Sequence, residues 1–491
     1  MSVIYALNFA FLLENLKTMV YTLINMVLEI HMLKKNDILQ VKIESISGDG
    51  SGIARRDGQV IFVPFTAVGD SAEITVIKVT KSYAVGKLTK IISPSDKRCS
   101  PDCQAFGKCG GCVFRHLTLE EEERLKTETV RSAIIRIGHL NVEVKGCITP
   151  TVKGYRNKAQ LPVTEDKNGL ACGFYANHSH RIVTESIDCV TSPKIFGDIA
   201  KSILGFMKRE NILGYNEELS SGVVRHLYMR INSDGKVMVC IVTNTPHLIS
   251  EKTEKKFTSF LTEEFSNIVS IYLNYNSKNT NVVLGDDYRL LCGDEYFEDK
   301  LLDTKLKMSP DSFFQVNREG AEKIYSIGFS MLSGHYENVY DLYCGIGSIG
   351  ITLFNEIKKG NIKATADRLF GIEIVEKAAE CARVNAKLNG IDNAEFAATD
   401  STDITKMDWF DKYPPSLVIL DPPRKGTTTQ LIDFLSDRNV KEILYISCDP
   451  ATLARDMGYF KEKGYTFSPV YPVNLFTGTK HVECCVLIHK D

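Results

Sequence analysis

The stretch KEILYISCDPATLARDM, residues 441–457, indicates which fold to expect. Residues 442–447 form a short apolar run rich in Ile, Leu and Tyr, which is typical of a buried strand. Asp449 is a good helix N-cap and Pro450 is favoured at the first helical position, so a helix is predicted to begin there. Cys448 therefore lies where a strand ends and a helix begins.

This position gives Cys448 two interpretations. A helix N-terminus carries a positive partial charge, which is expected to lower the pKa of a thiol and favour the thiolate. Ligands of open α/β sheets bind at the carboxyl ends of strands, so the thiol is a candidate nucleophile. The alternative is that Cys448 is a small apolar residue that fills space at the strand end. The local pattern fits both interpretations, and the segments upstream decide between them.

The last 180 or so residues alternate between apolar strand patterns and amphipathic helix patterns. This alternation predicts a doubly wound parallel sheet with helices on both faces. The segments that carry the alternation are residues 338–354, 369–390, 415–426, 441–457 and 481–490.

A glycine-rich turn follows the first of these strands. Gly345, Gly347 and Gly350 satisfy the pattern G-x-G-x-x-G, and Glu373 ends the next strand, where it can hold ribose hydroxyls. S-adenosylmethionine and NAD would both use such a site. Asp421 and the two prolines after it favour the first ligand, because methyltransferases acting on nucleobases commonly carry such a rigid, acceptor-bearing strand end.

Length and composition are those of a globular protein with two to four domains. The chain has 491 residues, of which 44% are hydrophobic and 24% charged, and its net charge is −2. Any nucleic-acid partner must therefore be bound by local basic patches. The 14 cysteines are clustered rather than evenly spaced. This favours metal or cluster binding in a reducing, cytoplasmic compartment over a disulfide framework.

Four of the cysteines lie between Cys99 and Cys112. The spacing Cys103-x5-Cys109-x2-Cys112 brings three thiolates together on a glycine-rich loop, and the fourth ligand must come from elsewhere, with Cys189 and Cys99 as candidates. Thiolate-only sites suit iron–sulfur clusters or structural zinc. The alternative is a group of reduced surface thiols. Radical chemistry would require C-x3-C-x2-C, which this spacing does not match.

The N-terminal residues 1–31 differ from the rest of the chain. They are apolar, but Glu14, Lys17 and Glu29 interrupt them, so no uncharged run reaches the ~18 to 20 residues that span a bilayer. A basic n-region and a small-residue cleavage site are also missing from the segment. We expect an appendage ahead of Met32 and, less readily, a membrane-surface helix. No stable membrane partner is expected.

Residues 33–95 are expected to form a small barrel. Five short alternating strands separated by glycine-rich turns predict a β-barrel of the OB type, and such barrels often bind oligonucleotides. Its surface could equally be solvated without a ligand.

Residues 119–138 are predicted to be helical, since acidic residues begin the segment and basic residues end it. The pattern from residue 146 to about 305 is mixed α+β. It contains residues that could meet phosphate or base, although surface ion pairing explains each of them equally well. They are Tyr155, Arg156, Lys158, Arg225, His226 and Arg230.

Taken together, these segments resemble the folate-independent RNA uracil-C5 methyltransferases, and more closely the iron–sulfur branch that modifies large-subunit ribosomal RNA. The resemblance runs from Met32 to the C-terminus, and its motifs recur in one order. They are the TRAM-like barrel, the cysteine loop, GFYANHSHRIV with the DC that ends at Cys189, SFFQVN, DLYCGIG, DPPRKG, SCDPATLARD and HVE.

The resemblance implies an extension (1–31), a TRAM-like barrel (32–95), a central domain with an iron–sulfur loop (96–305) and an S-adenosylmethionine-dependent methyltransferase domain of Rossmann-like α/β fold (306–491). It implies that Cys448 is the nucleophile and Glu483 the base. Ser348 departs from the family pattern, in which some members carry Asn. The implied cluster ligands are Cys103, Cys109, Cys112 and Cys189 for 4Fe–4S, and the implied donor-site residues are Gln315, Tyr343, Ser348, Glu373, Asp400 and Asp421.

The chemistry of the implied reaction explains these residue types. Addition of the Cys448 thiolate to carbon-6 of uracil makes carbon-5 nucleophilic, so that it can take the methyl group. Glu483 then removes the carbon-5 proton and the cysteine leaves. The implied substrate is a uridine of 23S ribosomal RNA, extruded from its stack. Transfer RNA is an alternative substrate, and a nicotinamide-dependent oxidoreductase and a noncatalytic RNA-binding factor are alternative functions.

Overall fold

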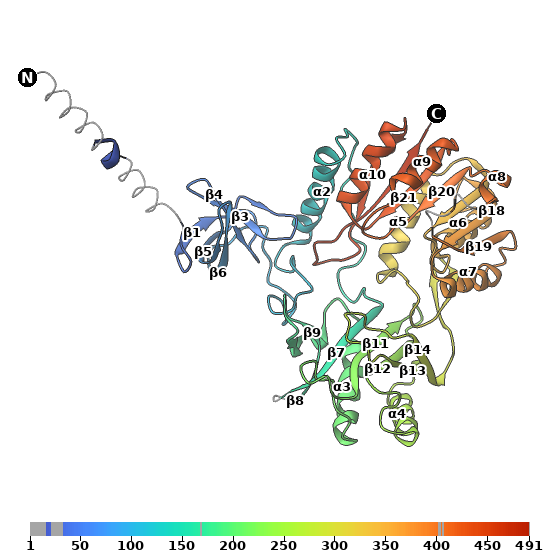
Figure 1. Cartoon of the computed structure of the whole chain (residues 1–491), viewed down its shortest axis with the longest axis horizontal. Helices are drawn as coiled ribbons and strands as arrows, with labels where there is room; N and C mark the ends of the chain where they lie inside the picture. The colour runs from blue at the N-terminus through green and yellow to red at the C-terminus, as the bar shows by residue number, and fades with distance from the viewer. Residues whose placement is uncertain (1–15, 21–32, 167–168, 401–403, 405–406, 491) are drawn as a thin grey trace, which may run out of the picture. The chain divides into compact units, whose positions relative to one another are not determined.

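The computed structural model describes residues 16–20, 33–166, 169–400, 404 and 407–490. Two compact units divide the chain: Met1–Ser100 with His116–Thr118 form the smaller, and Pro101–Arg115 with Leu119–Asp491 form the larger (Figure 1). Most of the predicted N-terminal extension lies outside the described residues. Within the described ranges, none of the helices combines the length and apolar character needed to span a bilayer.

The smaller unit is a six-stranded sheet in which small and β-branched side chains alternate with exposed ones. Its strand order is β1-β5-β6-β4-β3-β2. Ile61, Ile74 and Val76 are fully buried in its core. The sequence predicted five strands; the additional one is a two-residue strand before the Gly48–Gly52 turn. The strands are β1 Ile38–Lys42, β2 Ser45–Ile46, β3 Gly52–Arg56, β4 Gln59–Val63, β5 Ser71–Val79 and β6 Tyr83–Ser93.

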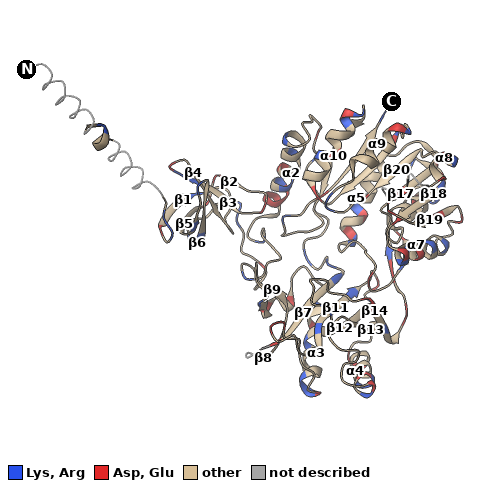
Figure 2. Ribbon diagram, viewed as in Figure 1, with Lys and Arg blue, Asp and Glu red and all other residues tan. Residues whose placement is uncertain are grey.

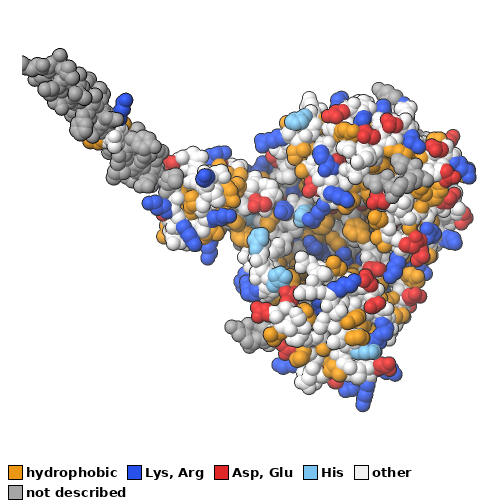
Figure 3. Space-filling model, viewed as in Figure 1, with side chains coloured by type: hydrophobic (Ala, Val, Ile, Leu, Met, Phe, Trp, Pro, Cys, Tyr) orange, Lys and Arg blue, Asp and Glu red, His pale blue; other side chains and the backbone are white. Residues whose placement is uncertain are grey.

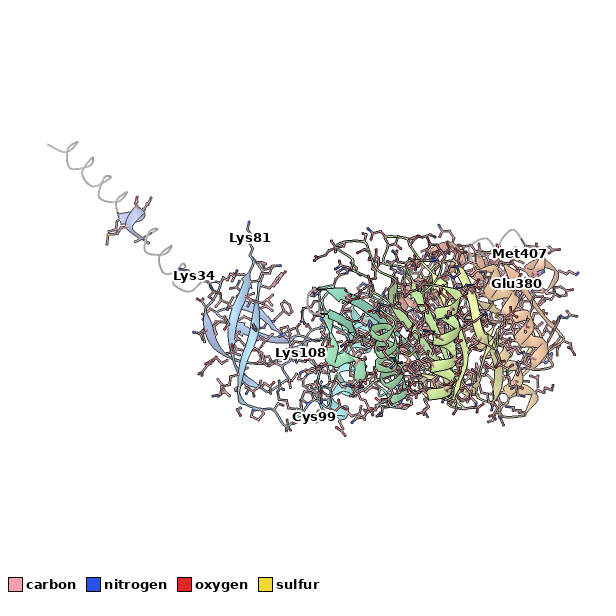
Figure 4. All side chains as sticks on the ribbon, turned by 90° about the horizontal axis from the view of Figure 1, so that it is seen from below. Lys34, Lys81, Cys99, Lys108, Glu380 and Met407 are labelled. Carbon is pink, nitrogen blue, oxygen red and sulfur yellow. The ribbon has the colours of Figure 1, made fainter. Side chains whose placement is uncertain are left out.

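A buried carboxylate ties the end of the barrel together. Asp70 accepts a hydrogen bond from Ala67 N and from Ser95 N, and Arg98 Nε lies 2.8 Å from its Oδ2. His116 belongs to this unit because its Nε2 lies 3.1 Å from Thr66 O. Figure 4 shows Lys81 at the tip of the β5–β6 hairpin, with Cys99 at the opposite end of the barrel strands.

After the cysteine loop, the larger unit continues with helix α2, Leu119–Arg136, as the charge pattern predicted. Its inner face carries a buried ion pair, with Lys126 Nζ 2.8 Å from Glu122 Oε1. Asn474 Nδ2 donates to the same Glu122 oxygen at 3.0 Å. These contacts attach α2 to a distant segment just before the last strand of the chain.

A second six-stranded sheet follows, with the order β14-β13-β12-β11-β7-β8. Helices α3 and α4 cover one of its faces, packing on Leu161, Leu227 and Met229. The opposite face carries Lys158, Tyr228 and Arg230. The elements are β7 Lys158–Asp166, β8 Gly169–Cys172, β9 Phe174–Tyr175, β10 Ile182–Val183, α3 Lys194–Arg209, β11 Val224–Ile231, β12 Val237–Thr243, α4 Glu251–Glu264, β13 Ile268–Tyr275 and β14 Asp287–Gly293.

The C-terminal part of the larger unit is the predicted doubly wound sheet. Its order is β19-β18-β17-β20-β21-β24-β22, with β23 also paired to β24. Strands β17 to β21 are parallel, and β24 is antiparallel to β21. The strands are β17 His335–Leu342, β18 Thr365–Glu373, β19 Ala394–Ala398, β20 Leu417–Leu420, β21 Glu442–Ser447, β22 Thr466–Phe467, β23 Tyr471–Val473 and β24 Glu483–His489.

Helices cover both faces of this sheet (Figure 1). Helices α5, α6 and α7 pack on one face, and α2, α9 and α10 pack on the other. Strand order reverses between β17 and β20, so a ligand crevice is expected at their carboxyl ends. The elements not yet given are the hairpin β15 Phe297–Leu301 and β16 Thr304–Met308, and the helices α5 Arg318–Ser330, α6 Ser348–Lys358, α7 Glu376–Leu388, α8 Trp409–Lys412, α9 Thr429–Asp437 and α10 Pro450–Glu462.

Basic and acidic residues are not segregated into different parts of the chain. Figure 2 shows basic and acidic residues mixed along the ribbon, in agreement with the net charge of −2.

Candidate active site

A cavity of about 820 Å³ lies at the carboxyl ends of strands β17, β18, β20 and β21. Both predicted catalytic residues and nearly all of the predicted donor-site residues line it. Ser348, the first residue of α6, is the exception among the predicted residues. The lining includes Gln315, Tyr343, Glu373, Asp400, Asp421, Cys448 and Glu483.

The glycine-rich turn forms one end of this cavity. Tyr343 (φ 67°), Gly345 (φ 56°) and Gly347 (φ 81°) all adopt left-handed backbone conformations, which a tyrosine rarely does. Glu373 holds the turn, because its Oε2 accepts from Gly345 N at 3.0 Å and its Oε1 from Val375 N at 2.9 Å. The turn therefore leaves its backbone open to a ligand.

Asp341 lies directly beneath the turn. Its Oδ2 accepts a hydrogen bond from Gly350 N at 2.8 Å, and a Cβ at residue 350 would come within 2.9 Å of that oxygen. Its Oδ1 is buried and has no hydrogen-bond partner among the described residues. Burial raises the pKa of Asp341 to about 7.

Cys448 lies between β21 and α10, as predicted. Asp449 caps the helix, with its Oδ1 accepting from Ala451 N at 2.9 Å and Thr452 N at 3.0 Å. The predicted lowering of the thiol's pKa is wrong, because burial and the nearby Glu483 and Asp421 raise it to about 11. Desolvation and two carboxyl groups outweigh the helix dipole.

Glu483 faces the thiol from the neighbouring strand. Ser447 of β21 pairs with Cys484 of the antiparallel strand β24. Extending this register by one pair places Cys448 opposite Glu483. Glu483 is buried, and burial followed by Asp421 raises its pKa to about 8. Burial likewise raises the pKa of Asp421 to about 7. The candidate nucleophile Cys448 therefore lies near two carboxyl groups whose pKa values are close to neutral pH.

The cavity is also lined by residues that sequence reasoning did not assign, among them Phe313, Arg424, Phe476 and His481. The positive charge of Arg424 opposes the upward pKa shifts of Cys448 and Glu483. Burial, followed by Arg424, lowers the pKa of His481 to about 4, so its imidazole is neutral. Arg424 lies in the DPPRKG motif and His481 in the HVE motif. Their place in these two motifs was the sequence signal that could have identified them as cavity residues.

A second cavity, of about 360 Å³, is lined by the four cysteines predicted to bind a cluster. Cys103, Cys109 and Cys112 come from the glycine-rich loop, and Cys189 follows the short helix Thr184–Asp188. Cys99 belongs to the smaller unit, where its thiol donates to Leu117 O at 3.0 Å.

The thiols of this second cavity influence one another. Burial raises the pKa of Cys112 to about 11, with Cys189 adding to the rise and Arg115 opposing it. Gly111 N donates to Cys109 Sγ at 3.4 Å, a contact that favours a thiolate. In the described part of the chain, no three Cys, His, Asp or Glu side chains stand close enough to share a single metal ion.

One segment, residues 474–481, lines the catalytic cavity and is also hydrogen-bonded to the residues that follow the cysteine loop. Phe476 and His481 line the catalytic cavity, with their ring centroids 6.0 Å apart. Gly478 O accepts from Val113 N at 2.8 Å and from Phe114 N at 2.9 Å, immediately after Cys112. The segment before the catalytic strand is therefore hydrogen-bonded to the cysteine loop.

The basic residues singled out from the sequence separate into two groups. Arg225 is buried, and its guanidinium donates to Asn276 O and Lys278 O. Arg230 is buried and binds carbonyl oxygens of residues 310 and 312. Arg156 and Lys158 are only half-buried.

Comparison with known proteins identifies the family. Residues 140–491 match the family described as tRNA (uracil-5-)-methyltransferase, and residues 33–89 match the TRAM domain. The chain belongs to the tRNA (uracil-5-)-methyltransferase family. This confirms the predicted family, the barrel, and the classification as an RNA methyltransferase.

Relatives of this family member extend over nearly the whole chain. An uncharacterized RNA methyltransferase of Clostridium tetani is 35% identical over 460 residues, which are 93% of this chain and 97% of the relative. One from Clostridium acetobutylicum is 38% identical over 472 residues, which are 93% and 98% of the two chains.

A solved structure shares the fold. The Pyrococcus abyssi tRNA (uracil-54, C5)-methyltransferase, in complex with S-adenosyl-L-homocysteine, superposes with a TM-score of 0.72 at 27% identity. The match covers 91% of this chain and 99% of that one. The predicted barrel and methyltransferase sheet are thus confirmed at the level of the fold.

Proposed function

We propose that this chain uses S-adenosylmethionine to methylate carbon-5 of a uridine in 23S ribosomal RNA through a covalent bond to Cys448. One observation carries the proposal: Cys448 and Glu483 line the same cavity as the glycine-rich turn and Glu373. The cavity therefore has room for a methyl donor at one end and a base at the other.

The donor end fits S-adenosylmethionine. Glu373 lines the cavity, and both of its carboxylate oxygens accept hydrogen bonds that hold the turn, from Gly345 N and Val375 N. Gly345 lines the same cavity, with open space where a Cβ would lie. When bound, S-adenosylmethionine would supply the methyl group on a positively charged sulfonium. The relative of solved structure, which binds S-adenosyl-L-homocysteine, supports this assignment.

The chain's own residues carry the remaining steps. The thiolate of Cys448 adds to carbon-6 of the uracil, and the resulting enolate lets carbon-5 take the methyl group. Glu483, as carboxylate, accepts the carbon-5 proton, and the carbon–sulfur bond then breaks to return the thiolate. Arg424 supplies positive charge beside the thiol, which offsets the two carboxyl groups.

Covalent trapping tests this mechanism. RNA carrying 5-fluorouridine should form a stable protein adduct with the wild-type chain, because fluorine cannot leave as a proton. Cys448→Ala should form no adduct and should lose about 10⁴-fold or more in methyl transfer, while retaining S-adenosylhomocysteine binding. An adduct in the alanine variant would exclude Cys448 as the nucleophile; Cys484→Ala, on the neighbouring strand, serves as the control.

The proposed cluster is 4Fe–4S, held by Cys103, Cys109, Cys112 and Cys189. Each thiolate of such a cluster binds a different iron, so the sulfurs need not converge on one point. With four thiolate ligands it would have no open iron, which suits a structural role linking the cysteine loop to residue 189. Iron and sulfide analysis should give about four of each per chain, and Cys189→Ala should lower both.

Transfer RNA is the second candidate substrate, because the name of the solved relative specifies a tRNA uridine. The four-cysteine cavity and the motif resemblance support ribosomal RNA instead. Transfer of tritiated methyl groups to unmodified 23S and tRNA transcripts decides between them. With this function we propose the domain boundaries 32–95, 96–305 and 306–491, and a cytoplasmic location.

A further inference from the structure

Two basic side chains flank the start of β7, next to the catalytic cavity. Between Arg156 and Lys158, Asn157 donates from its N–H to Val316 O at 2.8 Å and from Nδ2 to Gln315 O at 2.9 Å. Gln315 lines the catalytic cavity. The strand start that carries both cations is therefore fixed to the segment that shapes the cavity.

Of the described side chains, no carboxylate is paired with either cation, although Arg156 also lines the four-cysteine cavity, where its charge opposes the upward pKa shifts of Cys109 and Cys112. Lys158 pairs across the sheet with Arg230, whose guanidinium donates to the carbonyl oxygens of Ser312 and Pro310. Those partners are neutral. Among the described residues, neither Arg156 nor Lys158 forms an ion pair within 4.0 Å. Three positive charges therefore share one edge with no carboxylate beside them.

The environment of Lys158 reflects this crowding. Burial, followed by the charges of Arg230 and Arg156, lowers the pKa of Lys158 to about 8. A bound anion would relieve the repulsion between the cations and raise the pKa of Lys158 towards its ordinary value. Basic residues of helix α3, which covers the other face of this sheet, already have partners: Lys194 contacts Asp198 at 2.6 Å, and Lys201 contacts Asp188 at 2.6 Å.

The geometry points to Arg156 and Lys158 as a phosphate subsite that binds the RNA backbone next to the uridine held in the catalytic cavity; this subsite rests on the proposed function. A guanidinium can bind two phosphate oxygens at once, and an ammonium adds a compact charge. Figure 3 shows Lys and Arg side chains around a hollow on this face of the larger unit. We assign a phosphodiester group as the ligand because the subsite offers cations and lies beside the catalytic cavity, which would hold the base.

Salt-dependent binding tests the subsite without requiring catalysis. The affinity of unmodified 23S transcript is measured by filter binding across about 50 to 200 mM salt. Loss of one phosphate contact to single-stranded RNA lowers the log–log salt slope by about 0.7, which weakens binding about fivefold near 0.1 M salt. We expect this for Lys158→Gln and for Arg156→Gln.

Two variants control for other effects. Lys194→Gln makes the same change on α3 and should leave both slope and affinity unaltered. Lys158→Arg keeps the charge and should restore most of the affinity. S-adenosylhomocysteine binding should be the same in all of these variants, which excludes general misfolding as the cause.

A Lys158→Gln variant whose salt slope and affinity equal those of the wild type would overturn the subsite. If RNA binding depends on Lys158 but no 5-methyluridine forms, the proposed function fails and the subsite stands. A last experiment compares inorganic phosphate with 23S transcript as protectants of the Lys158 amine against reductive methylation. If phosphate protects the amine and the transcript does not, the site does not bind RNA. Protection by the transcript supports the subsite.

Discussion

The two cavities of the larger unit hold thiols with similar acidity in opposite surroundings. Burial raises the pKa of both Cys112 and Cys448 to about 11. Around Cys112 the other influences are the cations Arg115 and Arg156 and a second thiol, Cys189. Around Cys448 they are the carboxyl groups of Glu483 and Asp421, opposed by Arg424.

This difference indicates how each sulfur becomes a thiolate. Four thiols that share a cavity can be ionised together by metal ions, which bind thiolates and release protons. A single thiol beside two carboxyl groups ionises most readily when those groups are neutral or when positive charge is added. Similar thiol acidity in the two cavities therefore serves different chemistry. Three perturbations test this contrast.

The largest effect is expected from Glu483→Gln, which removes the base and one of the two carboxyl groups near Cys448. Turnover should fall by about 10² to 10⁴-fold, the usual contribution of a general base. In the wild type, the pH profile of kcat/KM should contain a step with a pKa of about 8, where Glu483 is half ionised, and this step should disappear in the variant. Steady-state methyl transfer across pH measures both.

Glu395→Gln, on the exposed strand β19, is the matched control for this experiment. The reactivity of the Cys448 thiol provides a second measurement. Iodoacetamide should alkylate Cys448 several-fold faster in Glu483→Gln, because a raising influence on the thiol's pKa is gone. Unchanged alkylation of Cys448 would mean that the carboxyl group does not govern its acidity.

A smaller effect is expected on stability. The folded pKa of Glu483, about 8, lies above its ordinary value of 4.5, so the folded state retains a proton that the unfolded state has lost. Stability is therefore highest below pH 4.5 as far as this group is concerned, and it falls as pH rises towards 8. Glu483→Gln should reduce the difference in Tm between pH 5 and pH 8, equivalent to a few kcal/mol at most. A pH dependence of Tm identical to that of the wild type would contradict the buried, protonated state.

The smallest effect concerns the segment that joins the cavities. Gly478 has φ 85°, and a Cβ there would lie 2.7 Å from Arg115 Nε. Gly478→Ala should lower the free energy of unfolding by about 1 to 3 kcal/mol through strain and displacement of Arg115. Gly235→Ala is the matched control, with φ 75° and open space around the added carbon. Equal losses in the two variants, measured by denaturant unfolding, would show that the Arg115 contact contributes nothing.

Much of the catalytic cavity could be predicted from sequence because its parts are local. Strand ends, the N-cap Asp449 and the glycine spacing each depend on residues within a few positions. These parts come together because the carboxyl ends of parallel strands lie at the same edge of the sheet. That logic brought Cys448, Asp421 and Glu373 together, and the structure has all three on one cavity.

The remainder depends on contacts between distant segments. The acidity of Cys448 was predicted in the wrong direction because burial and Glu483 come from other parts of the chain. Arg225 and Arg230 looked like candidates for phosphate contacts, but their carbonyl partners lie about 50 and 80 positions away. No sequence pattern distinguishes such a buried arginine from an available one.

The order of strands along the chain has a consequence for biosynthesis. Residues 441–457 are translated before β24, yet β24 completes the sheet beside them and begins with Glu483. On the proposed mechanism, a nascent polypeptide that has already formed the nucleophile's strand and helix still lacks its proton acceptor. On that mechanism, such a polypeptide cannot complete methyl transfer until Glu483 has docked beside Cys448.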